Sequence, residues 1–308
     1  MKHIQPGDRI VVTGATGFVG KILAEDLASA GYRVIGISER EEVPAHLANS
    51  LHDYHPVDLT RGWPKVGPFE GLVHLAGLAA VGPSFERPQD YIVSNSAMAT
   101  HLFENALGEN WQGRVIIASS GAVYDSNGDS TGLTECSPLL ASSPYVVSKL
   151  LVENQTAYYV RRGVDAVVAR PFNHIGPGQL PGFIVPDLTA KVRKWRPDSM
   201  LTVRNLDSAR DYTDVRDIAR AYRLLLELDE PLHTTYNVCS GNVRSGWEVL
   251  EAICKALGKP KPPTQVKADR AIDPSLIRGN GERIKLETGW QPIIELQKSI
   301  NDYVSATA

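Results

Sequence analysis

Residues 9–20 read RIVVTGATGFVG, and this stretch decides the fold of the chain. The β-branched run RIVV indicates a buried strand, and in the KILAEDL that follows the stretch the apolar positions fall on one helical stripe. Between them, Gly14 permits a tight turn, Gly17 lets the backbone approach a pyrophosphate, and Gly20 allows close packing of helix on strand. A helix N-terminus favours an anion. The stretch therefore predicts a strand, a phosphate-binding turn and a helix.

Comparable apolar runs recur along the first half of the chain. They cover 33–37, after the helix closes at Gly31, and then 71–75, 114–118 and 165–169. Each resembles a strand buried on both faces of a parallel sheet, and helical patterns lie between them. Strands that alternate with helices predict an α/β fold, a Rossmann-type doubly wound parallel sheet whose ligands bind at the carboxyl ends of the strands.

The character of the sequence changes after about residue 171. The stretch 171–186 (PFNHIGPGQLPGFIVP) is rich in Pro and Gly, as is 259–263, which is typical of a smaller, loop-rich lobe. The strand-like run 235–238 is expected to return to the first sheet, so the boundary is interleaved. We therefore predict a dinucleotide-binding Rossmann domain formed by residues 1–170 with about 211–240, and a C-terminal substrate-binding lobe formed by residues 171–210 and 241–308.

The composition narrows the functional classes. The chain has 308 residues, of which 43% are hydrophobic and 22% charged, and its formal net charge of -3 predicts no general attraction to nucleic acid or to an anionic membrane. The opening MKHIQPGDRI lacks the pattern of a signal peptide, and no stretch approaches the roughly 18 apolar residues of a membrane span, so we expect a cytoplasmic protein. Three cysteines, none in a C-x-x-C pair, cannot make a disulfide framework or a four-cysteine zinc site.

The end of the second predicted strand bears on the cofactor. An acidic side chain there would bind the ribose 2′-hydroxyl of NAD and repel a 2′-phosphate. The sequence reads Ser38-Glu39-Arg40, in which Ser38 can donate to a phosphate and Arg40 can pair with it, and this favours NADP(H) over NAD(H). NAD(H) stays open, because Glu39 would favour it if turned inward, and because both charged side chains could simply face solvent. Asp58 and Leu59 follow the third apparent strand, where an adenine ring would lie.

A second constellation carries acid–base chemistry. After Pro144, the four-residue spacing of Tyr145 and Lys149 sets both side chains on the same helical face. A nearby ammonium stabilises a phenolate, so Lys149 is expected to lower the pKa of Tyr145 toward neutrality. Upstream, the strand at 115–117 runs into a serine pair that ends at Ser120, which delivers a hydroxyl group to the carboxyl edge of the sheet.

Four motifs in this order resemble the extended short-chain dehydrogenase/reductase family, which includes NAD-dependent epimerases and dehydratases. They are TGATGFVG, the HLAG of residues 74–77, ASSGAVYD and YVVSK, and the likeness extends over nearly the whole chain. The resemblance implies that Ser120, Tyr145 and Lys149 form the catalytic triad. In it, Ser120 holds the substrate oxygen and Lys149 also bridges the nicotinamide ribose.

Two further positions bear on the resemblance. Asn95 falls where the family often has a structural or catalytic asparagine, whereas Asp125 is a departure, because the family usually has Gly after Val-Tyr. Together with the arguments above, the resemblance implies cofactor contacts at Gly14, Thr16, Gly17, Phe18, Val19, Ser38, Arg40, Asp58, Leu59, Leu75, Ala76, Gly77, Asn95, Tyr145, Lys149 and Pro171.

The residues beside the catalytic hydroxyl bear on the type of reaction. Sugar-nucleotide dehydratases of this family need an acid and a base there, and Gly121 and Ala122 can transfer no proton, which disfavours dehydration. Reduction of a carbonyl needs only the tyrosine acid, the cofactor and a positioned substrate. These residues therefore favour simple hydride transfer.

The second lobe resembles, within this family, the reductases of GDP-4-keto-6-deoxy-D-mannose that make GDP-D-rhamnose. The stretches that carry the likeness are 170–179, 205–217, 236–241 and 279–292. It implies that Asn173 and Arg210 contact a GDP-linked sugar nucleotide and that Arg270 binds its diphosphate, which guanidinium groups recognise well. Surface ion pairs stay open for both arginines, Arg210 with Asp211 or Asp214 and Arg270 beside Asp269 and Asp273.

Two remaining features concern metals and assembly. His74 and His174 lie near the expected cleft, but no second ligand stands at metal spacing, so we predict no metal.

A helix that carries Ala97, Leu102, Phe103 and Ala106 has a packing stripe. The resemblance implies that this helix and the helix of Tyr145 form a four-helix bundle in a homodimer.

The leading hypothesis is an NADPH-dependent reductase of the 4-keto group of a GDP-4-keto-6-deoxyhexose, in which Tyr145 protonates the developing alkoxide. One alternative is an NDP-sugar 4-epimerase with tightly bound NAD. A second is a non-catalytic dinucleotide-binding sensor or scaffold. Neither the C4 configuration of the product, rhamno or talo, nor the nucleobase follows from these residues.

Overall fold

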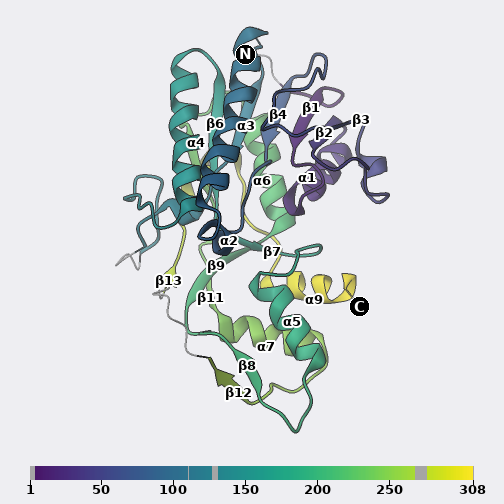
Figure 1. Ribbon diagram of the computed structural model, residues 1–308, viewed down its shortest axis with the longest axis vertical. Coiled ribbons are helices and arrows are strands. Elements are labelled where there is room, and N and C mark those ends of the chain that lie inside the picture. Colours follow the sequence, from purple (N-terminus) through teal and green to yellow (C-terminus); the bar gives the residue numbers. More distant parts are fainter. Residues whose placement is uncertain (1–3, 110, 127–130, 268–275, 308) are drawn as a thin grey trace.

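A parallel sheet of seven strands forms the centre of the larger lobe, at the top of Figure 1. The computed structural model describes residues 4–109, 111–126, 131–267 and 276–307. The strand order is β10-β6-β5-β4-β1-β2-β3, and every neighbouring pair is parallel. This confirms the predicted doubly wound α/β fold. The strands are β1 Arg9–Thr13, β2 Arg33–Ser38, β3 Asp53–Pro56, β4 Gly71–His74, β5 Arg114–Ala118, β6 Asp165–Pro171 and β10 Thr235–Val238.

The strand order reverses between β1 and β4, which are neighbours in the sheet although β2 and β3 come between them in the chain. Such a switch point opens a crevice at the carboxyl ends of the strands. Thr13, the last residue of β1, pairs with His74, the last residue of β4. The glycine turn after β1 and the loop after β4 therefore meet at this edge of the sheet.

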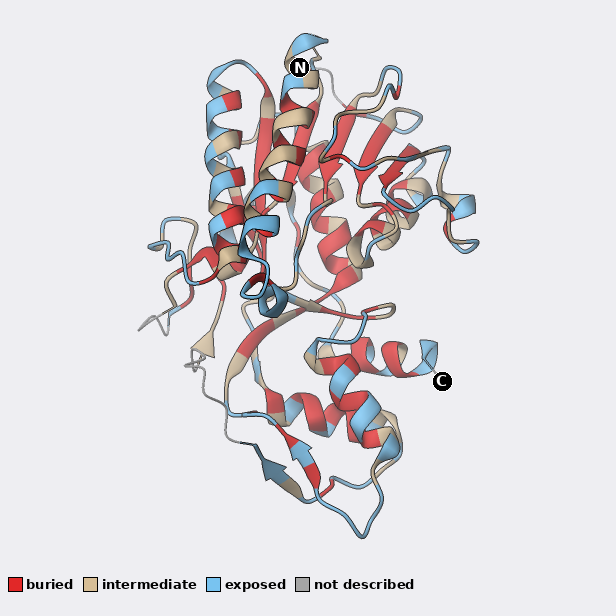
Figure 2. Cartoon of the chain, viewed as in Figure 1, coloured by how far each residue is buried: buried red, intermediate tan, exposed pale blue. Residues whose placement is uncertain are grey.

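Helices cover both faces of the sheet, and α1 and α6 pack on one face while α3 and α4 pack on the other. Alternate strand residues supply the two cores. Ile10 and Val12 of β1 pack with the first pair of helices and Val11 packs with the second, and all three are fully buried within the red strands of Figure 2. The helices of this lobe are α1 Phe18–Ser29, α2 Val81–Ser84, α3 Pro88–Gly108, α4 Pro144–Arg161, α6 Val215–Glu227 and α8 Glu282–Thr288, with short 3-10 turns at Ala48–Ser50 and Gly121–Val123.

The smaller lobe has its own sheet and its own core. Val185, Leu188, Val249 and Leu250 are buried in that core, at the interface of α5 with α7. Its strands are β7 Asn173–Ile175, β9 Ala209–Asp214, β11 Val243–Ser245 and β13 Leu276–Ile277, with a second pair formed by β8 Leu201–Val203 and β12 Thr264–Val266. Its helices are α5 Ile184–Lys194, α7 Gly246–Ala256 and α9 Leu296–Ala306.

The chain passes between the lobes more than once. β9 pairs with β7, β11 and β13 in the smaller sheet, whereas α6 and β10 lie in the larger lobe. The predicted return of residues 235–238 is confirmed, because Thr235 pairs with Val168 of β6. Near the C-terminus, Trp290 is buried in the larger core and donates from its indole nitrogen to the Asp217 carbonyl at 2.9 Å. The division of the chain into two domains at the predicted residues stays a prediction.

In the described ranges, no helix combines the length and the apolar character that a membrane span requires.

Candidate active site

Three glycines build the turn between β1 and α1. Gly14 has φ of 67°, and a Cβ atom there would lie 2.9 Å from the Ala76 backbone nitrogen. A Cβ atom at Gly20 would lie 2.1 Å from the carbonyl oxygen of Gly14, so a side chain at either position would collide with backbone. Gly17 is the N-cap of α1, and no side chain caps that helix. The first amides of α1 are therefore presented at the crevice, as a phosphate-binding turn requires.

A cavity of about 520 Å³ lies at this edge of the sheet, and we call it the dinucleotide cavity. Its walls come from the turn after β1, the end of β2, the segment after β3 and the loop after β4. The predicted cofactor contacts that line it are Gly14, Thr16, Gly17, Phe18, Ser38, Arg40, Asp58, Leu59, Leu75, Ala76 and Gly77. Its place at the switch point, its volume and its glycine cradle fit a nicotinamide dinucleotide.

The remaining predicted cofactor contacts are not among the residues that line this cavity. Val19 packs against the core beneath α1, and Pro171 is buried at the end of β6. Asn95 is buried on α3, where its amide bonds to both backbone groups of Leu78 and donates to Ser148 Oγ at 2.9 Å. Asn95 therefore joins the loop after β4 to α4. The roles of Tyr145 and Lys149 toward a cofactor also stay predictions.

The end of β2 carries both signs of charge. Ser38 Oγ lies 2.6 Å from Thr16 Oγ1, and Glu39 and Arg40 both line the cavity. Lys21, which the sequence reasoning did not single out, lines it too, and its Nζ donates to the Gly178 carbonyl at 3.3 Å across the two lobes. Burial, opposed by the nearby Glu25 carboxylate, lowers the pKa of Lys21. Its position one turn after Gly17 was the signal that could have identified it.

Helix α4 holds the predicted acid–base pair. Pro144 opens the helix and Ser143 caps it by accepting a hydrogen bond from the Val146 amide at 3.2 Å. Lys149 Nζ lies 5.9 Å from the centroid of the Tyr145 ring and donates to the Ala118 carbonyl at 2.8 Å. Both side chains are buried. The helix thus brings this pair to the end of β5, where Ser120 follows.

The pKa of Tyr145 differs from the expectation. Burial raises the pKa of Tyr145, although a hydrogen bond with Ser120 acts in the opposite direction. The prediction that this pKa lies toward neutrality is wrong for this structure, because desolvation of the phenolate outweighs the effect of Ser120, which opposes it. Burial lowers the pKa of Lys149 to about 8, and Glu153 opposes that change. Tyr145 therefore carries its proton at neutral pH.

The two histidines near the crevice are hydrogen-bonded packing residues. His74 Nδ1 lies 2.9 Å from Thr13 Oγ1, and burial lowers the pKa of His74 to about 3. Thr13 Oγ1 also accepts from the amides that begin the loop after β4. The ring of His174 stacks on Phe18 with centroids 5.8 Å apart, which connects β7 to the glycine turn. Both imidazoles are neutral at pH 7 because burial lowers the pKa of each.

The predicted substrate residues fall on the strands between the lobes. Asn173 begins β7 and pairs with Tyr212 of β9, and Arg210 stands two residues earlier on β9. Arg210 is buried and donates to the Ala209 carbonyl at 2.9 Å. Arg270 lies outside the described residues. The contacts of these residues with a sugar nucleotide stay predictions.

Sequence reasoning missed a buried ion pair next to the acid–base pair. Glu153 of α4 meets Arg170 of β6, with Oε2 and the guanidinium nitrogen 2.6 Å apart. The Glu153 side chain also accepts a hydrogen bond from Ser119 Oγ at 2.5 Å. The signal that could have identified Glu153 was its spacing of four residues from Lys149, which places both on one face of the helix, whereas its partner Arg170 lies on another element.

The packing stripe on α3 faces inward. Leu102 and Phe103 are buried in the core between α3 and the sheet, and the Phe103 ring stacks on Tyr159 of α4 with centroids 4.7 Å apart. These residues join α3 to α4 within one chain. Ala106 is also buried, and Ala97 is half-buried. The homodimer stays a prediction.

Comparison with known proteins agrees with this geometry. The profile of the NAD dependent epimerase/dehydratase family matches residues 10–239. The chain is 30% identical, over 96% of each chain, to GDP-6-deoxy-D-mannose reductase of Pseudomonas aeruginosa. It is 29% identical to UDP-glucose 4-epimerase of Corynebacterium glutamicum, over 92% of this chain and 91% of that one.

A solved structure gives the same picture. The UDP-glucose 4-epimerase of Thermus thermophilus, in complex with NAD, is similar with a TM-score of 0.82 and 27% identity, and the match covers 97% of this chain and 98% of that one. The family match spans β1 to β10, the strands that form the sheet and its crevice. The chain therefore belongs to the NAD-dependent epimerase/dehydratase family.

Proposed function

We propose that this protein is an NADPH-dependent reductase of the 4-keto group of a GDP-linked 4-keto-6-deoxyhexose. The observation that carries the proposal is a buried phenol, Tyr145, which keeps its proton at neutral pH and lies on α4 beside Lys149, whose ammonium bonds to the end of β5 just before Ser120. A reductase needs such an acid to protonate the alkoxide that forms at the carbonyl carbon. The 30% identity to the Pseudomonas aeruginosa GDP-6-deoxy-D-mannose reductase supports the substrate class.

Each residue of the site has its own role in the proposed reduction. A bound nicotinamide dinucleotide supplies the hydride for reduction. Tyr145 gives its proton to the substrate oxygen at C4, and Ser120 orients the same oxygen by a hydrogen bond. Lys149, held by its bond to the Ala118 carbonyl, stabilises the phenolate that remains on Tyr145. Gly121 and Ala122 can move no proton, which is consistent with reduction and not with loss of water.

The substrate is expected to reach this site from the smaller lobe. Asn173 and Arg210 lie on neighbouring strands between the lobes and are proposed to bind the sugar nucleotide, Arg210 through a charge-assisted bond to its diphosphate. Arg270 is proposed as the second diphosphate ligand. Exchange of either arginine for Gln should raise the KM for the sugar nucleotide more than it lowers kcat.

A direct assay tests the proposal. Purified protein is mixed with NADPH and GDP-4-keto-6-deoxymannose, and the loss of NADPH absorbance is followed beside the Tyr145→Phe variant. We expect oxidation in the native protein and a loss of about 10²-fold to 10⁴-fold in the variant, the usual contribution of a positioned acid. NADPH binding to the variant is measured alongside, so that loss of the acid is separated from loss of a cofactor contact. If NADPH is not oxidised, the reductase assignment fails.

A 4-epimerase is the second candidate. The 29% identity to the Corynebacterium glutamicum UDP-glucose 4-epimerase favours it nearly as much as the identity to the reductase favours the first. An epimerase would retain NAD through purification and interconvert NDP-hexoses at C4 with no net change in the dinucleotide. Release of bound NAD from the denatured protein, followed by an assay with UDP-glucose, decides between the two.

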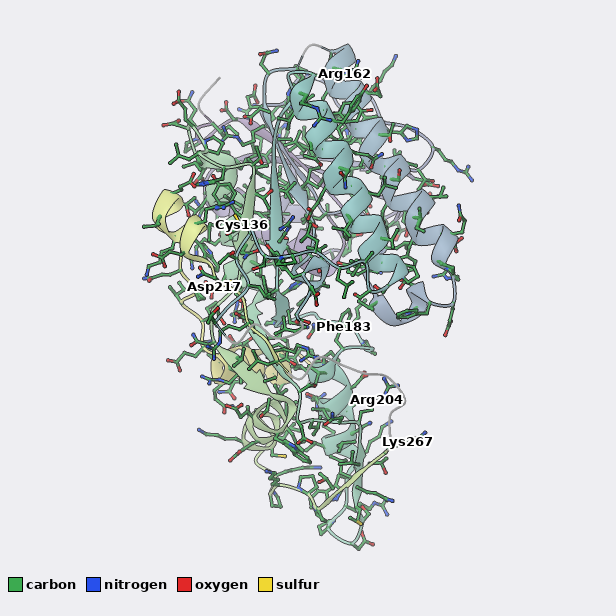
Figure 3. The ribbon with its side chains drawn as sticks, turned by 90° about the vertical axis from the view of Figure 1, so that its left-hand side faces the viewer. Cys136, Arg162, Phe183, Arg204, Asp217 and Lys267 are labelled. Atoms are coloured by element: carbon green, nitrogen blue, oxygen red, sulfur yellow. The ribbon has the colours of Figure 1, made fainter. Side chains whose placement is uncertain are left out.

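The outer faces of α3 and α4 are proposed to form a homodimer. Val93 of α3 and Val147, Leu151 and Tyr158 of α4 are exposed apolar side chains, and the two helices face the viewer in Figure 3, where Arg162 marks the C-terminal end of α4. Clustered exposed apolar residues mark an interface. Sedimentation of the native protein and of Leu151→Glu tests the dimer. The carboxylate that this substitution introduces into the interface should dissociate it.

A further inference from the structure

One face of α4 reaches three successive residues at the end of β5. Tyr145, Lys149 and Glu153 stand four residues apart on the helix, so their side chains form one row. They meet residues 118–120. Lys149 Nζ donates to the Ala118 carbonyl at 2.8 Å, Glu153 Oε1 accepts from the Ser119 hydroxyl at 2.5 Å, and the Ser120 hydroxyl acts to lower the pKa of Tyr145. The position of Ser120 is therefore tied to this row.

The carboxylate of Glu153 is fixed at both oxygens. Arg170 Nε donates to Oε1 at 2.9 Å and a terminal guanidinium nitrogen donates to Oε2 at 2.6 Å, in a bidentate pair. The side chains of Arg170 and Glu153 are only 6% and 11% exposed. Arg170 is held in turn by Tyr124, whose hydroxyl accepts from it at 2.8 Å. An ion pair fixed so firmly gives Glu153 one position relative to β5.

We propose that Glu153 is a positioning residue for the acid–base pair, a deepening that rests on the proposed function. Through Ser119 it sets the path of the backbone that carries Ser120, and its negative charge balances the buried ammonium of Lys149. Glu153 touches neither substrate nor cofactor in this role. It acts through the residues on either side of it in the row.

The charge argument follows from what surrounds Lys149. Among the described residues, the lysine has no carboxylate within ion-pair distance, and it donates to the backbone carbonyl of Ala118. The titratable groups that face it are Tyr145 and Glu153 on α4 and His74 on β4, with Arg170 beyond Glu153. Of these, only Glu153 supplies negative charge at neutral pH. Without it, the pKa of Lys149, already lowered to about 8 by burial, should fall further.

Glu153→Gln removes the charge and keeps an amide oxygen that can accept from Ser119 and Arg170. Glu153→Asp keeps the charge on a shorter side chain. Asp165→Asn is a matched control, because Asp165 also pairs with a buried arginine, Arg114, at 2.8 Å, but at the opposite end of β5 and β6. All three variants break or weaken a buried ion pair next to the same two strands.

The first readout is the pH dependence of kcat. In Glu153→Gln we expect the alkaline limb to move to lower pH by at least about 0.5 unit, and in Glu153→Asp to return toward the native position. Asp165→Asn should leave the limb in place. A lower kcat in Glu153→Gln with an unmoved limb, as a merely structural role would give, overturns the proposal.

The second readout needs no turnover, so it separates this proposal from the proposed function. Lysine labelled with ¹³C at Cε is titrated by NMR in the intact protein, and Lys149→Met identifies the signal of Lys149. A lower pKa of Lys149 in Glu153→Gln than in the native protein supports the proposal even if the keto sugar is not reduced. An identical titration in the two proteins overturns it, whatever the activity assay gives.

Discussion

The hydroxyl groups of Thr16 and Ser38 lie 2.6 Å apart, which joins the glycine turn to the end of β2 at the wall of the dinucleotide cavity. Each hydroxyl thereby gains a fixed direction, and Arg40 lines the same cavity two residues further on. Within the described ranges, no carboxylate forms an ion pair with Arg40. A guanidinium beside a fixed hydroxyl is an arrangement suited to a phosphate.

Arg40→Ala is expected to weaken NADPH binding by about tenfold to a hundredfold, the usual value of a hydrogen bond to a charged group, while NADH binding changes little. Fluorescence titration of the protein without sugar measures both. Glu39→Gln, its neighbour on the same wall, is the control and should bind NADPH at least as well as the native protein. Equal weakening of both dinucleotides in Arg40→Ala would contradict the NADP preference.

The pKa of Lys149 sets a limit on the alkaline side of the activity. Burial lowers that pKa to about 8, and the ammonium must keep its proton to stabilise the phenolate of Tyr145. We therefore expect kcat to decline above about pH 8, in a profile measured between about pH 6 and pH 9.5. A kcat that rises steadily through this range would show that the neutral amine is the active form of Lys149.

Gly20 tests how far the glycine turn depends on the absence of a side chain. In Gly20→Ala the new Cβ atom would lie 2.1 Å from the Gly14 carbonyl oxygen, and because that oxygen belongs to the backbone, the turn or the helix must shift. We expect a loss of about 1–3 kcal/mol in the free energy of unfolding and a marked loss of dinucleotide affinity. Gly108→Ala, where nothing lies within 4 Å of the added atom, is the matched control and should bind normally.

The sequence predicts the larger lobe well because its signals are local. Strands such as β1 and β5 are buried on both faces and read as continuous apolar runs, and the turn at Gly14 needs a backbone that only glycine adopts readily. The four-residue spacing of Tyr145 and Lys149 is likewise a local signal, because on α4 it places both side chains on one face of the helix.

The features of the site that the sequence does not predict depend on packing between segments that are far apart in the chain. The direction of the Tyr145 pKa follows from burial, which only the assembled core determines. Lys21 meets Gly178 across the lobes, and Glu153 meets Arg170 from a different element. The periodicity of a single helix cannot predict such pairs, because each partner belongs to another face of the fold.

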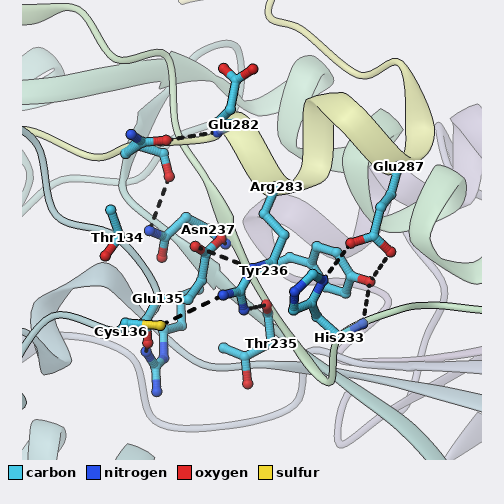
Figure 4. A network of polar contacts seen from close by, with 12 residues as sticks. Thr134, Glu135, Cys136, His233, Thr235, Tyr236, Asn237, Glu282, Arg283 and Glu287 are labelled. Atoms are coloured by element: carbon cyan, nitrogen blue, oxygen red, sulfur yellow. Dashed lines mark hydrogen bonds and ion pairs between the residues drawn. The ribbon is translucent and has the colours of Figure 1, made fainter.

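The outer edge of β10 is covered by an ion pair, shown in Figure 4. The Glu135 carboxylate accepts from the backbone amide of Asn237 at 2.7 Å, and Arg283 donates to the backbone carbonyl of Thr235 at 2.9 Å. The carboxylate and the guanidinium lie 3.6 Å apart. Edge strands with unpaired backbone groups invite pairing with other chains. The two side chains therefore satisfy backbone groups of β10 that face away from β6.

Arg283→Ala should cost about 1–3 kcal/mol in the free energy of unfolding, because it leaves the Thr235 carbonyl without its donor and Oε2 of the buried Glu135 carboxylate without its ion pair. Light scattering should also detect more self-association on warming. Arg244→Ala removes an arginine of the exposed pair with Glu248 and should change the free energy of unfolding by no more than about 0.5 kcal/mol. Equal effects of the two substitutions would show that the edge is not protected by Arg283.

Burial of His74 makes the free energy of unfolding depend on pH. Its folded pKa is lowered to about 3, against 6.5 for an ordinary histidine, so between these values the unfolded chain binds a proton that the folded chain does not. Stability is then highest above pH 6.5 and falls as the pH drops, by about 2 kcal/mol between pH 6.5 and pH 5 for this group alone. Urea unfolding across that range measures the slope. His74→Asn should lose this part of the slope, whereas His52→Asn, at an exposed position, should keep it. An unchanged slope in His74→Asn would mean that other groups cause the acid sensitivity.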